Sequence, residues 1–354
     1  MDVLYGVCGE GMGHATRSDV IARGLQRAGH RIQFACSEGR ALEYLRSRWP
    51  DVVCVPGFRL VVEDNRVLPT PTLLHNLARQ LGSPLDHVAS GLQVRLPDVV
   101  LCDFDAWTAR YAKLVGRPLV AIDNIHFLTR CSHPQAWIEA HKDAAAAAMI
   151  TAQSTVPEAS FYIVLSFTRL AGVRQPLTAL HLPVVRESVL RQTARTGSHL
   201  VAYFNDRADW PSILAALQDA SPMPVRAYGR PGTASASVVG NVTLCPLSED
   251  GLAEDLASCA AAVGGAGFSF LSEALVLRKP LLAVPFAESF EQILNGRYLQ
   301  AEGYGQWAEK LTSGVLRDFL SRLRPMRERL ARFPGAGNEQ LAGSLGRLLV
   351  ELAA

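Results

Sequence analysis

Short apolar runs of strand length alternate with stretches of helical spacing along most of the chain. This alternation is typical of parallel βα units. One series of expected strands covers 3–8, 31–36, 51–55, 98–102 and 119–122, and a second covers 198–204, 225–228, 242–244, 260–263 and 281–284. Open parallel sheets bind ligands at the carboxyl ends of their strands. The pattern therefore predicts an α/β protein of two doubly wound, Rossmann-like domains that face a central cleft.

The division into domains follows from length and local composition. A chain of 354 residues exceeds the size at which one core keeps growing, and the polar stretch 183–197 separates the two series. We expect an N-terminal domain at 1–187, a C-terminal domain at 188–335, and a C-terminal helix at 336–354 that packs back on the first domain. Helices are also expected at 136–152 and 213–220, and the spacing of Leu and Val is helical across 316–352.

Composition excludes several classes of protein. Hydrophobic residues make up 49% of the chain and charged residues 19%, which suits globular cores and argues against disorder. The 35 basic and 33 acidic residues leave a net charge of +2, so we expect no nucleic-acid partner. The seven cysteines form no C-x-x-C pair and several lie in apolar runs, which favours buried thiols in a reducing compartment. Because neither an export signal nor a long apolar span is visible, we expect a cytoplasmic, soluble protein.

The first glycine-rich turn, 9–14, follows the first expected strand and opens a helix. It fails the dinucleotide pattern G-x-G-x-x-G because its third glycine comes one residue early, which disfavours a nicotinamide cofactor. The turn ends in His14, at a helix N-terminus, where an imidazolium is disfavoured and a neutral imidazole can accept a proton. We interpret His14 as a general base. The alternative is that it caps the helix or joins neighbouring amides in binding an anion.

This turn contains Gly11, Gly13, His14 and Arg17 in the pattern Gly-x-Gly-His-x-x-Arg. The pattern resembles GT-B glycosyltransferases of the lipid-II GlcNAc-transferase and UDP-glycosyltransferase superfamily. Segments 5–18 and 97–127 look especially like a bacterial and archaeal group labelled teichoic-acid-biosynthesis-like.

The resemblance implies that an aspartate after a later strand orients the base histidine. Asp103 is the matching position and Asp105 the spare candidate. Gly11, Gly13 and Arg17 would belong to the acceptor side or its loop. The competing interpretation is that either aspartate only caps the helix expected at 107–114.

The second glycine-rich turn, Gly-Gly-Ala-Gly at 264–267, also joins an expected strand to a helix. Such a turn offers amides and a positive helix end to an anion, and a diphosphate fits that description. Fixed amides can stabilise a departing nucleoside diphosphate without a metal ion. Ser269 lies in the first helical turn, and Glu273 follows four residues later on the same face, where it can accept hydrogen bonds from a ribose.

The stretch from this turn to Gln292 resembles the donor-binding motif of the same superfamily. On that match the turn residues Gly265, Ala266 and Gly267, together with Ser269, hold the diphosphate, and Glu273 holds the ribose. Glu291 and Gln292 would face the sugar hydroxyls, and Leu247 lies where the family's base-binding loop falls. A histidine that plant members carry is replaced here by Gly265. One diphosphate contact must then come from backbone amides or from the turn 205–207, although Arg207 could equally be an ordinary surface arginine.

Residues 57–96 form the variable region. Leu73, Leu74, Leu77, Ala78 and Leu81 have helical spacing. This stripe can face the core, shape an acceptor site or touch a membrane that carries a lipid acceptor. His126, His133, His141 and His181 lack metal-ligand spacing and are interpreted as structural.

The predicted function is inverting, metal-independent transfer of a sugar from a nucleoside-diphosphate sugar, UDP- or dTDP-linked, to a hydroxyl of a small molecule, lipid or glycan. We expect no cofactor besides that donor substrate. Two alternatives stay open, a nucleotide-sugar 2-epimerase and an inactive homologue that serves as a binding or activating subunit. The oligomeric state is left open.

Overall fold

The computed structural model describes residues 1–79, 83–89, 91–205 and 207–353. Contacts divide the chain into two compact units. The first unit comprises Met1–Val61, Leu68–Val184 and Gly337–Ala354, and the second comprises Val62–Val67 and Val185–Ala336. The chain crosses from the first unit to the second between Val184 and Val185, inside the polar stretch 183–197 where a linker is expected.

The first unit is built on a seven-stranded sheet whose strands are all parallel. Its order is β3-β2-β1-β6-β7-β8-β9. The strands are β1 (Asp2–Val7), β2 (Arg31–Cys36), β3 (Val52–Cys54), β6 (Val99–Asp103), β7 (Leu119–Asp123), β8 (Phe161–Leu165) and β9 (Thr178–His181). The five strands expected from sequence are confirmed, whereas the last two were not anticipated.

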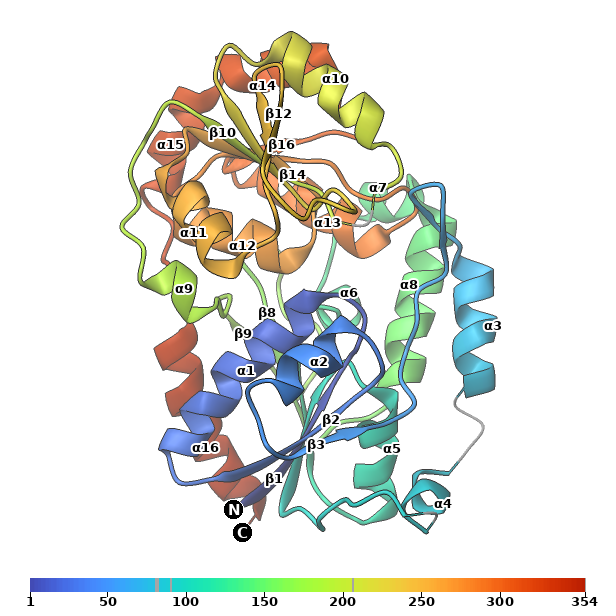
Figure 1. The fold of residues 1–354 in the computed structure, drawn as a ribbon. Coiled ribbons are helices and arrows are strands. Elements are labelled where there is room, and N and C mark those ends of the chain that lie inside the picture. The colour runs from blue at the N-terminus through green and yellow to red at the C-terminus, as the bar shows by residue number, and fades with distance from the viewer. Residues whose placement is uncertain (80–82, 90, 206, 354) are drawn as a thin grey trace. The chain divides into compact units, whose positions relative to one another are not determined.

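Helices cover this sheet because each βα unit returns the chain across one of its faces. They are α1 (Met12–Arg27), α2 (Arg40–Arg46), α3 (Pro69–Arg79), α4 (Pro84–Ala89), α5 (Ala106–Leu114), α6 (Phe127–Arg130), α7 (Gln135–Glu139), α8 (Lys142–Thr155) and α16 (Asn338–Ala353). The terminal helix α16 lies beside α1 within this unit (Figure 1). In the described part of the chain, no helix has the length and apolar character needed to cross a bilayer.

One helical expectation needs correction. The helix expected at 136–152 is divided into α7 and α8, because the chain leaves the helical conformation at His141 (φ −138°). The expected amphipathic stripe falls on α3, of which Leu74 is 62% exposed. The buried residues Thr72 and Asn76 of α3 accept hydrogen bonds from the amides of Val61 and Arg59. Leu81 lies outside the described residues.

The second unit contains another seven-stranded sheet, in the order β12-β13-β11-β10-β14-β15-β16. Its strands are β10 (Leu200–Tyr203), β11 (Val225–Tyr228), β12 (Ser237–Val239), β13 (Val242–Leu244), β14 (Ala261–Gly264), β15 (Leu281–Ala283) and β16 (Gly305–Trp307). Only the edge strand β12 runs antiparallel. Its helices are α9 (Glu187–Leu190), α10 (Trp210–Ala220), α11 (Glu249–Ser258), α12 (Phe268–Val276), α13 (Phe290–Ala301), α14 (Ser313–Ser321) and α15 (Leu323–Leu330). A two-stranded hairpin, β4 (Val62–Glu63) and β5 (Arg66–Val67), also belongs to this unit.

In both sheets the chain starts at a central strand, adds strands on one side of it, and then adds strands on the other side. The direction of winding changes between β1 and β6 in the first sheet, and between β10 and β14 in the second. At such a switch point, loops from neighbouring strands diverge and leave room for a ligand. The first glycine-rich turn follows β1, and the second follows β14, so each lies at the switch point of its own sheet. The fold is thus a mixed α/β architecture with two parallel, doubly wound sheets.

Candidate active site in two parts

The first part of the site joins α1 to the end of β6. His14, Arg17 and Ser18 share one face of α1 because residues three and four positions apart lie one above the other. All three side chains contact Asp103, the last residue of β6, which pairs with Val7 of β1 in the sheet. The Nδ1 atom of His14 lies 2.7 Å from Oδ1 of Asp103. Helix and sheet together therefore bring His14 and Asp103 into contact across 89 residues of sequence.

Asp103 is fully buried and ionised. Burial by itself would raise the pKa of this carboxyl, but the charges and hydrogen bonds of Arg17 and His14 outweigh burial and hold the pKa below its ordinary value. Arg17 donates from Nε to Oδ2 at 2.5 Å and from Nη2 to Oδ1 at 2.6 Å. Ser18 donates a longer bond of 3.2 Å to Oδ2. Asp103 is thus a hydrogen-bond acceptor beside His14 that is charged at neutral pH.

Arg17 occupies a place that the sequence did not predict. Its side chain is only 3% exposed, and its Nη1 donates to Oδ1 of Asn124 at 2.8 Å. Asn124 follows β7, the neighbour of β6 in the sheet. Arg17 was expected on the acceptor side or its loop, but burial makes it a support that fixes the carboxylate of Asp103. The buried carboxylate of Asp103 needs a partner of opposite charge, and the guanidinium of Arg17 binds both of its oxygens.

The protonation of His14 follows from these neighbours. A carboxylate can only accept, so the contact with Asp103 requires a proton on Nδ1 and leaves a lone pair on Nε2. Nη2 of Arg17 also lies 2.7 Å from Nδ1 and carries a second hydrogen beside the one that it donates to Asp103, so in the other tautomer Nδ1 would accept from Arg17. A proton on Nε2 instead would leave Oδ1 of Asp103 without the bond from His14. We interpret the contact with Asp103 as the one that sets the tautomer, which leaves Nε2 as the free base.

Asp105 has a different task from Asp103. It is the N-cap of α5, and its Oδ1 accepts hydrogen bonds from the amide of Thr108 at 2.8 Å and from the Thr108 hydroxyl at 2.7 Å. Between the two aspartates, Phe104 has φ +56°, an uncommon value for a residue with a side chain. This residue turns the chain away from the sheet, and its ring stacks on His14 at a centroid distance of 6.5 Å. The structure therefore selects Asp103, not Asp105, as the partner of His14.

The glycines of the first turn differ in what they do. Gly11 is exposed, has φ +78° and caps α1, and a Cβ on it would meet no atom within 4 Å. Its conformation therefore explains the glycine without a ligand. Gly13 lies inside the first turn of α1 and is half-buried.

A second candidate site, in the second unit, is the turn between β14 and α12. A Cβ on Gly264 would lie 2.5 Å from the backbone oxygen of Tyr203 and 2.7 Å from the ring of Phe270, so packing requires this glycine. Gly265 and Gly267 differ, because a Cβ on either would meet nothing within 4 Å and neither has a positive φ. The fold does not need glycine at these two positions. Glycine at these two positions lets a ligand approach the backbone closely.

The hydrogen-bonding groups of this turn are partly committed. The amide of Gly265 donates to the oxygen of Tyr203 at 3.3 Å, so this amide is engaged within the protein. Ala266 is buried, whereas Gly267 caps α12 and Ser269 in its first turn is half-buried. The amides at the start of a helix point towards its N-terminal end and attract an anion there.

Glu273 lies one turn after Ser269 and is 5% exposed. Its Oε2 accepts a hydrogen bond from Nη2 of Arg186 at 2.8 Å, and Nε of Arg186 lies 2.7 Å from Oε1 as an ion-pair contact without hydrogen-bond geometry. Arg186 directly precedes α9 and was not singled out from the sequence, because 87 residues separate the two partners. A carboxylate has about four lone-pair directions, of which Arg186 covers at most two. Glu273 can therefore still accept hydrogen bonds from two hydroxyl groups.

Glu291 and Gln292 begin α13, beyond the end of β15. Asn295 donates from Nδ2 to Oε1 of Glu291 at 2.6 Å and to the backbone oxygen of Ala266 at 3.1 Å, which ties α13 to the glycine turn. Oε1 of Gln292 accepts the amide of Phe286 at 3.0 Å. This bond orients the side-chain amide of Gln292 and leaves its NH₂ group as the donor for a ligand.

The loops after β13 and β10 complete this edge of the second sheet. Leu247 follows β13 and is 51% exposed, an apolar surface that a flat ring could cover. Arg207 follows β10 and is 8% exposed. Its guanidinium donates to both oxygens of Asp209 and to the backbone oxygen of Pro285. Arg207 is therefore a buried structural arginine in this structure, and not a surface one.

His126 and possible metal sites are the remaining functional candidates in the sequence, and over the described ranges the structure gives them no role in either glycine turn. His126 is buried, with Nδ1 2.7 Å from Oδ2 of Asp123, and this agrees with its interpretation as structural. Among the residues that the structure describes, no group of three or more His, Cys, Asp or Glu side chains is placed to hold a metal ion.

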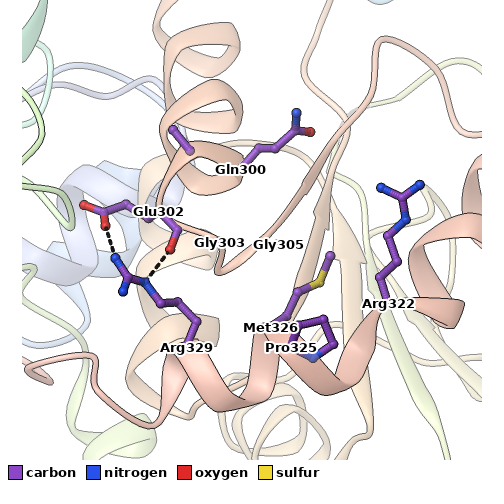
Figure 2. A pocket seen from close by; sticks show the side chains of 9 residues that line it. Gln300, Glu302, Gly303, Gly305, Arg322, Pro325, Met326 and Arg329 are labelled. Atoms are coloured by element: carbon purple, nitrogen blue, oxygen red, sulfur yellow. Dashed lines mark hydrogen bonds and ion pairs between the residues drawn. The ribbon is translucent and has the colours of Figure 1, made fainter.

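A cavity of about 470 Å³ lies elsewhere in the second unit, between the end of α13 and α15. Figure 2 shows Arg329 turned towards Glu302, with Arg322 on the other side of Pro325 and Met326. Nε of Arg329 donates to the backbone oxygen of Glu302 at 3.0 Å. Neither glycine turn contributes a residue to its lining, so we do not assign the reaction to this cavity.

Comparisons with known proteins agree with this architecture. The family model described as glycosyl transferase family 1 matches residues 1–324. CalG4, the calicheamicin glycosyltransferase, is 18% identical with a TM-score of 0.70, and the match covers 100% of this chain and 99% of that one. Spinosyn forosaminyltransferase SpnP is 16% identical with a TM-score of 0.65, at 99% coverage of both chains. No curated protein matches the chain by sequence.

A plant protein extends the comparison. UGT89C1 from Arabidopsis thaliana, solved in complex with UDP, is 13% identical with a TM-score of 0.67, at 100% coverage of both chains. A second structure of that protein holds quercetin. At these identities the similarity establishes the fold, which is the GT-B arrangement.

Proposed function

Because the chain belongs to glycosyl transferase family 1 and is a glycosyltransferase, we propose that it moves a sugar with inversion from a nucleoside-diphosphate sugar to an acceptor hydroxyl. The observation that carries this proposal is the contact of 2.7 Å between Nδ1 of His14 and the buried carboxylate of Asp103. This contact leaves a basic nitrogen, Nε2, whose conjugate acid would be stabilised by a fixed negative charge. The narrower resemblance to the teichoic-acid-biosynthesis-like group stays a prediction.

In the proposed reaction, Nε2 of His14 takes the proton of the acceptor hydroxyl while its oxygen attacks the anomeric carbon. The bond between that carbon and the diphosphate breaks from the opposite face, and the nucleoside diphosphate leaves with the electron pair. Asp103 keeps the imidazole oriented, and Arg17 keeps Asp103 charged and in place. General-base catalysis of this kind contributes about a hundredfold or more to the rate.

For the donor, the proposal assigns the diphosphate to the turn at Gly265 and Gly267. Support comes from the open space at both glycines and from the start of α12, which favours negative charge. Ser269 would contact a phosphate oxygen, and Glu273 would accept the two ribose hydroxyls on the lone pairs that Arg186 leaves unused. We place the base beside Leu247. The fixed dipoles of this turn would stabilise the leaving group without a metal ion.

Structural relatives support a nucleotide donor and a hydroxyl-bearing acceptor, because one holds UDP and another structure of the same protein holds quercetin. A thermal-shift panel of UDP, dTDP, GDP and ADP identifies the base, since a ligand that binds the native state raises its unfolding midpoint. An absence of any shift across the panel would contradict the donor assignment.

The base assignment is tested by His14→Ala. We expect the rate of transfer to fall at least about a hundredfold, while the dissociation constant of the nucleoside diphosphate stays within twofold of the parent protein. Turnover at the parent rate would exclude His14 as the base. Analysis of the products separates transfer from 2-epimerisation, which would yield an epimeric nucleotide sugar with no acceptor present.

A further inference from the structure

The hairpin 62–67 is an unusual part of the second unit, because the chain on either side of it belongs to the first. Its two strands pair antiparallel, Val62 with Val67 and Glu63 with Arg66. The two central residues, Asp64 and Asn65, have φ of 47° and 61°. Positive φ at both positions is typical of the tight type I′ connection, and Asn and Asp are the side chains that tolerate it best.

The hairpin is bonded to the loop between β15 and α13. The amide of Val67 donates to the oxygen of Ala287 at 3.0 Å, and the amide of Ala287 donates to the oxygen of Asn65 at 3.1 Å. Arg66 also forms an exposed ion pair with Glu288 at 3.3 Å, which contributes little by itself. Backbone pairing therefore extends the second unit by a segment from the first half of the chain.

Asn65 makes a further bond with its side chain. Its Oδ1 accepts the amide of Ala208 at 2.6 Å. Ala208 follows β10, whereas Ala287 follows β15, and β14 lies between these two strands in the sheet. One residue thus binds the loops on both sides of the strand that carries the glycine turn. Arg207 joins the same two loops a second time through Pro285.

The loop that Asn65 holds also orients Gln292. Phe286 precedes Ala287 and donates its amide to Oε1 of Gln292 at 3.0 Å. Glu288, directly after Ala287, has φ +61°, a conformation that persists only where neighbouring contacts hold it. A shift of this loop would therefore turn the side-chain amide of Gln292.

We propose that the hairpin 62–67 is part of the donor-sugar subsite, and that Asn65 is a positioning residue which sets sugar preference through Gln292. The proposal rests on the function proposed above. The ligand is the neutral sugar of the donor, whose hydroxyls Gln292 would distinguish. Nucleotide recognition does not depend on Asn65, because Leu247, Glu273 and the glycine turn carry it.

The test compares Asn65→Gly with Asn65→Asp. Glycine tolerates the positive φ and keeps the turn but removes Oδ1, whereas aspartate keeps an acceptor in the same place. For Asn65→Gly, misplacement of the side-chain amide of Gln292 weakens one hydrogen bond to the donor sugar, which predicts a rise of up to about tenfold in KM for the preferred donor. The ratio of kcat/KM between UDP-glucose and its C4 epimer UDP-galactose should fall by a similar factor. Asn65→Asp should retain both parameters.

Calorimetric titration with UDP provides the internal control. Its dissociation constant should stay within twofold in all variants. Glu328→Ala, an exposed change on α15 and outside the hairpin, should behave like the parent protein. Unchanged epimer discrimination in Asn65→Gly, or an equal defect in Asn65→Asp, overturns the role of Asn65 and leaves sugar transfer standing. If the parent protein neither binds UDP nor transfers sugar from these donors, the assignment of a UDP donor fails first, and this inference fails with it.

Discussion

Replacing Arg17 by methionine tests the electrostatic support of the first part of the site. The change removes the guanidinium and leaves the carboxylate of Asp103 to His14 and Ser18. The reciprocal change, Asp103→Asn, leaves the charge of Arg17 buried beside Asn124. The two side chains are 3% and 0% exposed, so water cannot compensate either charge.

The magnitude follows from the contacts. Arg17 donates two short bonds to Asp103, and charge-assisted bonds contribute roughly 1.5–3 kcal/mol each. Breaking a buried pair by removing one partner costs about 3–5 kcal/mol. We therefore expect each single variant to lose about 3–5 kcal/mol in free energy of unfolding, or roughly 10 °C in the midpoint of a unit of this size. The double variant removes both charges and should lose less than the sum of the two.

Scanning calorimetry and urea unfolding of the four proteins at pH 7 complete a double-mutant cycle. The pH dependence gives an independent check, because the folded-state pKa of Asp103 is depressed. Its stabilisation is present above the unfolded pKa and is lost as the pH falls through the folded value. The difference between the parent protein and Arg17→Met should thus be largest at neutral pH and shrink in acid. Single variants that each lose under about 1 kcal/mol and add in the double variant would refute the reasoning.

Two further predictions concern other residues of the site. Gly265→Ala and Gly267→Ala should unfold at the parental temperature yet bind the nucleoside diphosphate more weakly, whereas Gly264→Ala should unfold at a lower temperature because its Cβ would overlap the oxygen of Tyr203. Thermal melts measure the unfolding temperatures and titration calorimetry measures the binding. A lower unfolding temperature for Gly265→Ala would contradict the open space at this turn. Burial raises the pKa of Asp105 from 3.8 to about 6, so the parent protein should lose roughly 2 kcal/mol of stability as the pH rises from 4 to 6. Asp105→Asn should lack this loss in urea unfolding, and parallel pH profiles of the two proteins would contradict it.

Some features of the site could be predicted because their cause is local. The strand at 31–36 was placed at its observed bounds, since a short apolar run bounded by turn residues has few other solutions. The two glycine turns were placed between a strand and a helix for the same reason. The hairpin 62–67 gives no periodic signal in the sequence because two-residue strands are too short to show a period. Its pairing with Ala287 depends on the folded second unit.

The α/β class, the two series of strands and the positions of His14 and the glycine turns can be predicted from local sequence, because period and turn chemistry act over a few residues. The choice of the aspartate that contacts His14 depends on the folded chain. Asp103 ends β6 opposite Val7, while Phe104 turns the chain so that Asp105 caps α5. Folding also brings Arg17 to Asp103 and Arg186 to Glu273. Such pairings join residues far apart in the chain, and sheet register and burial select them after folding.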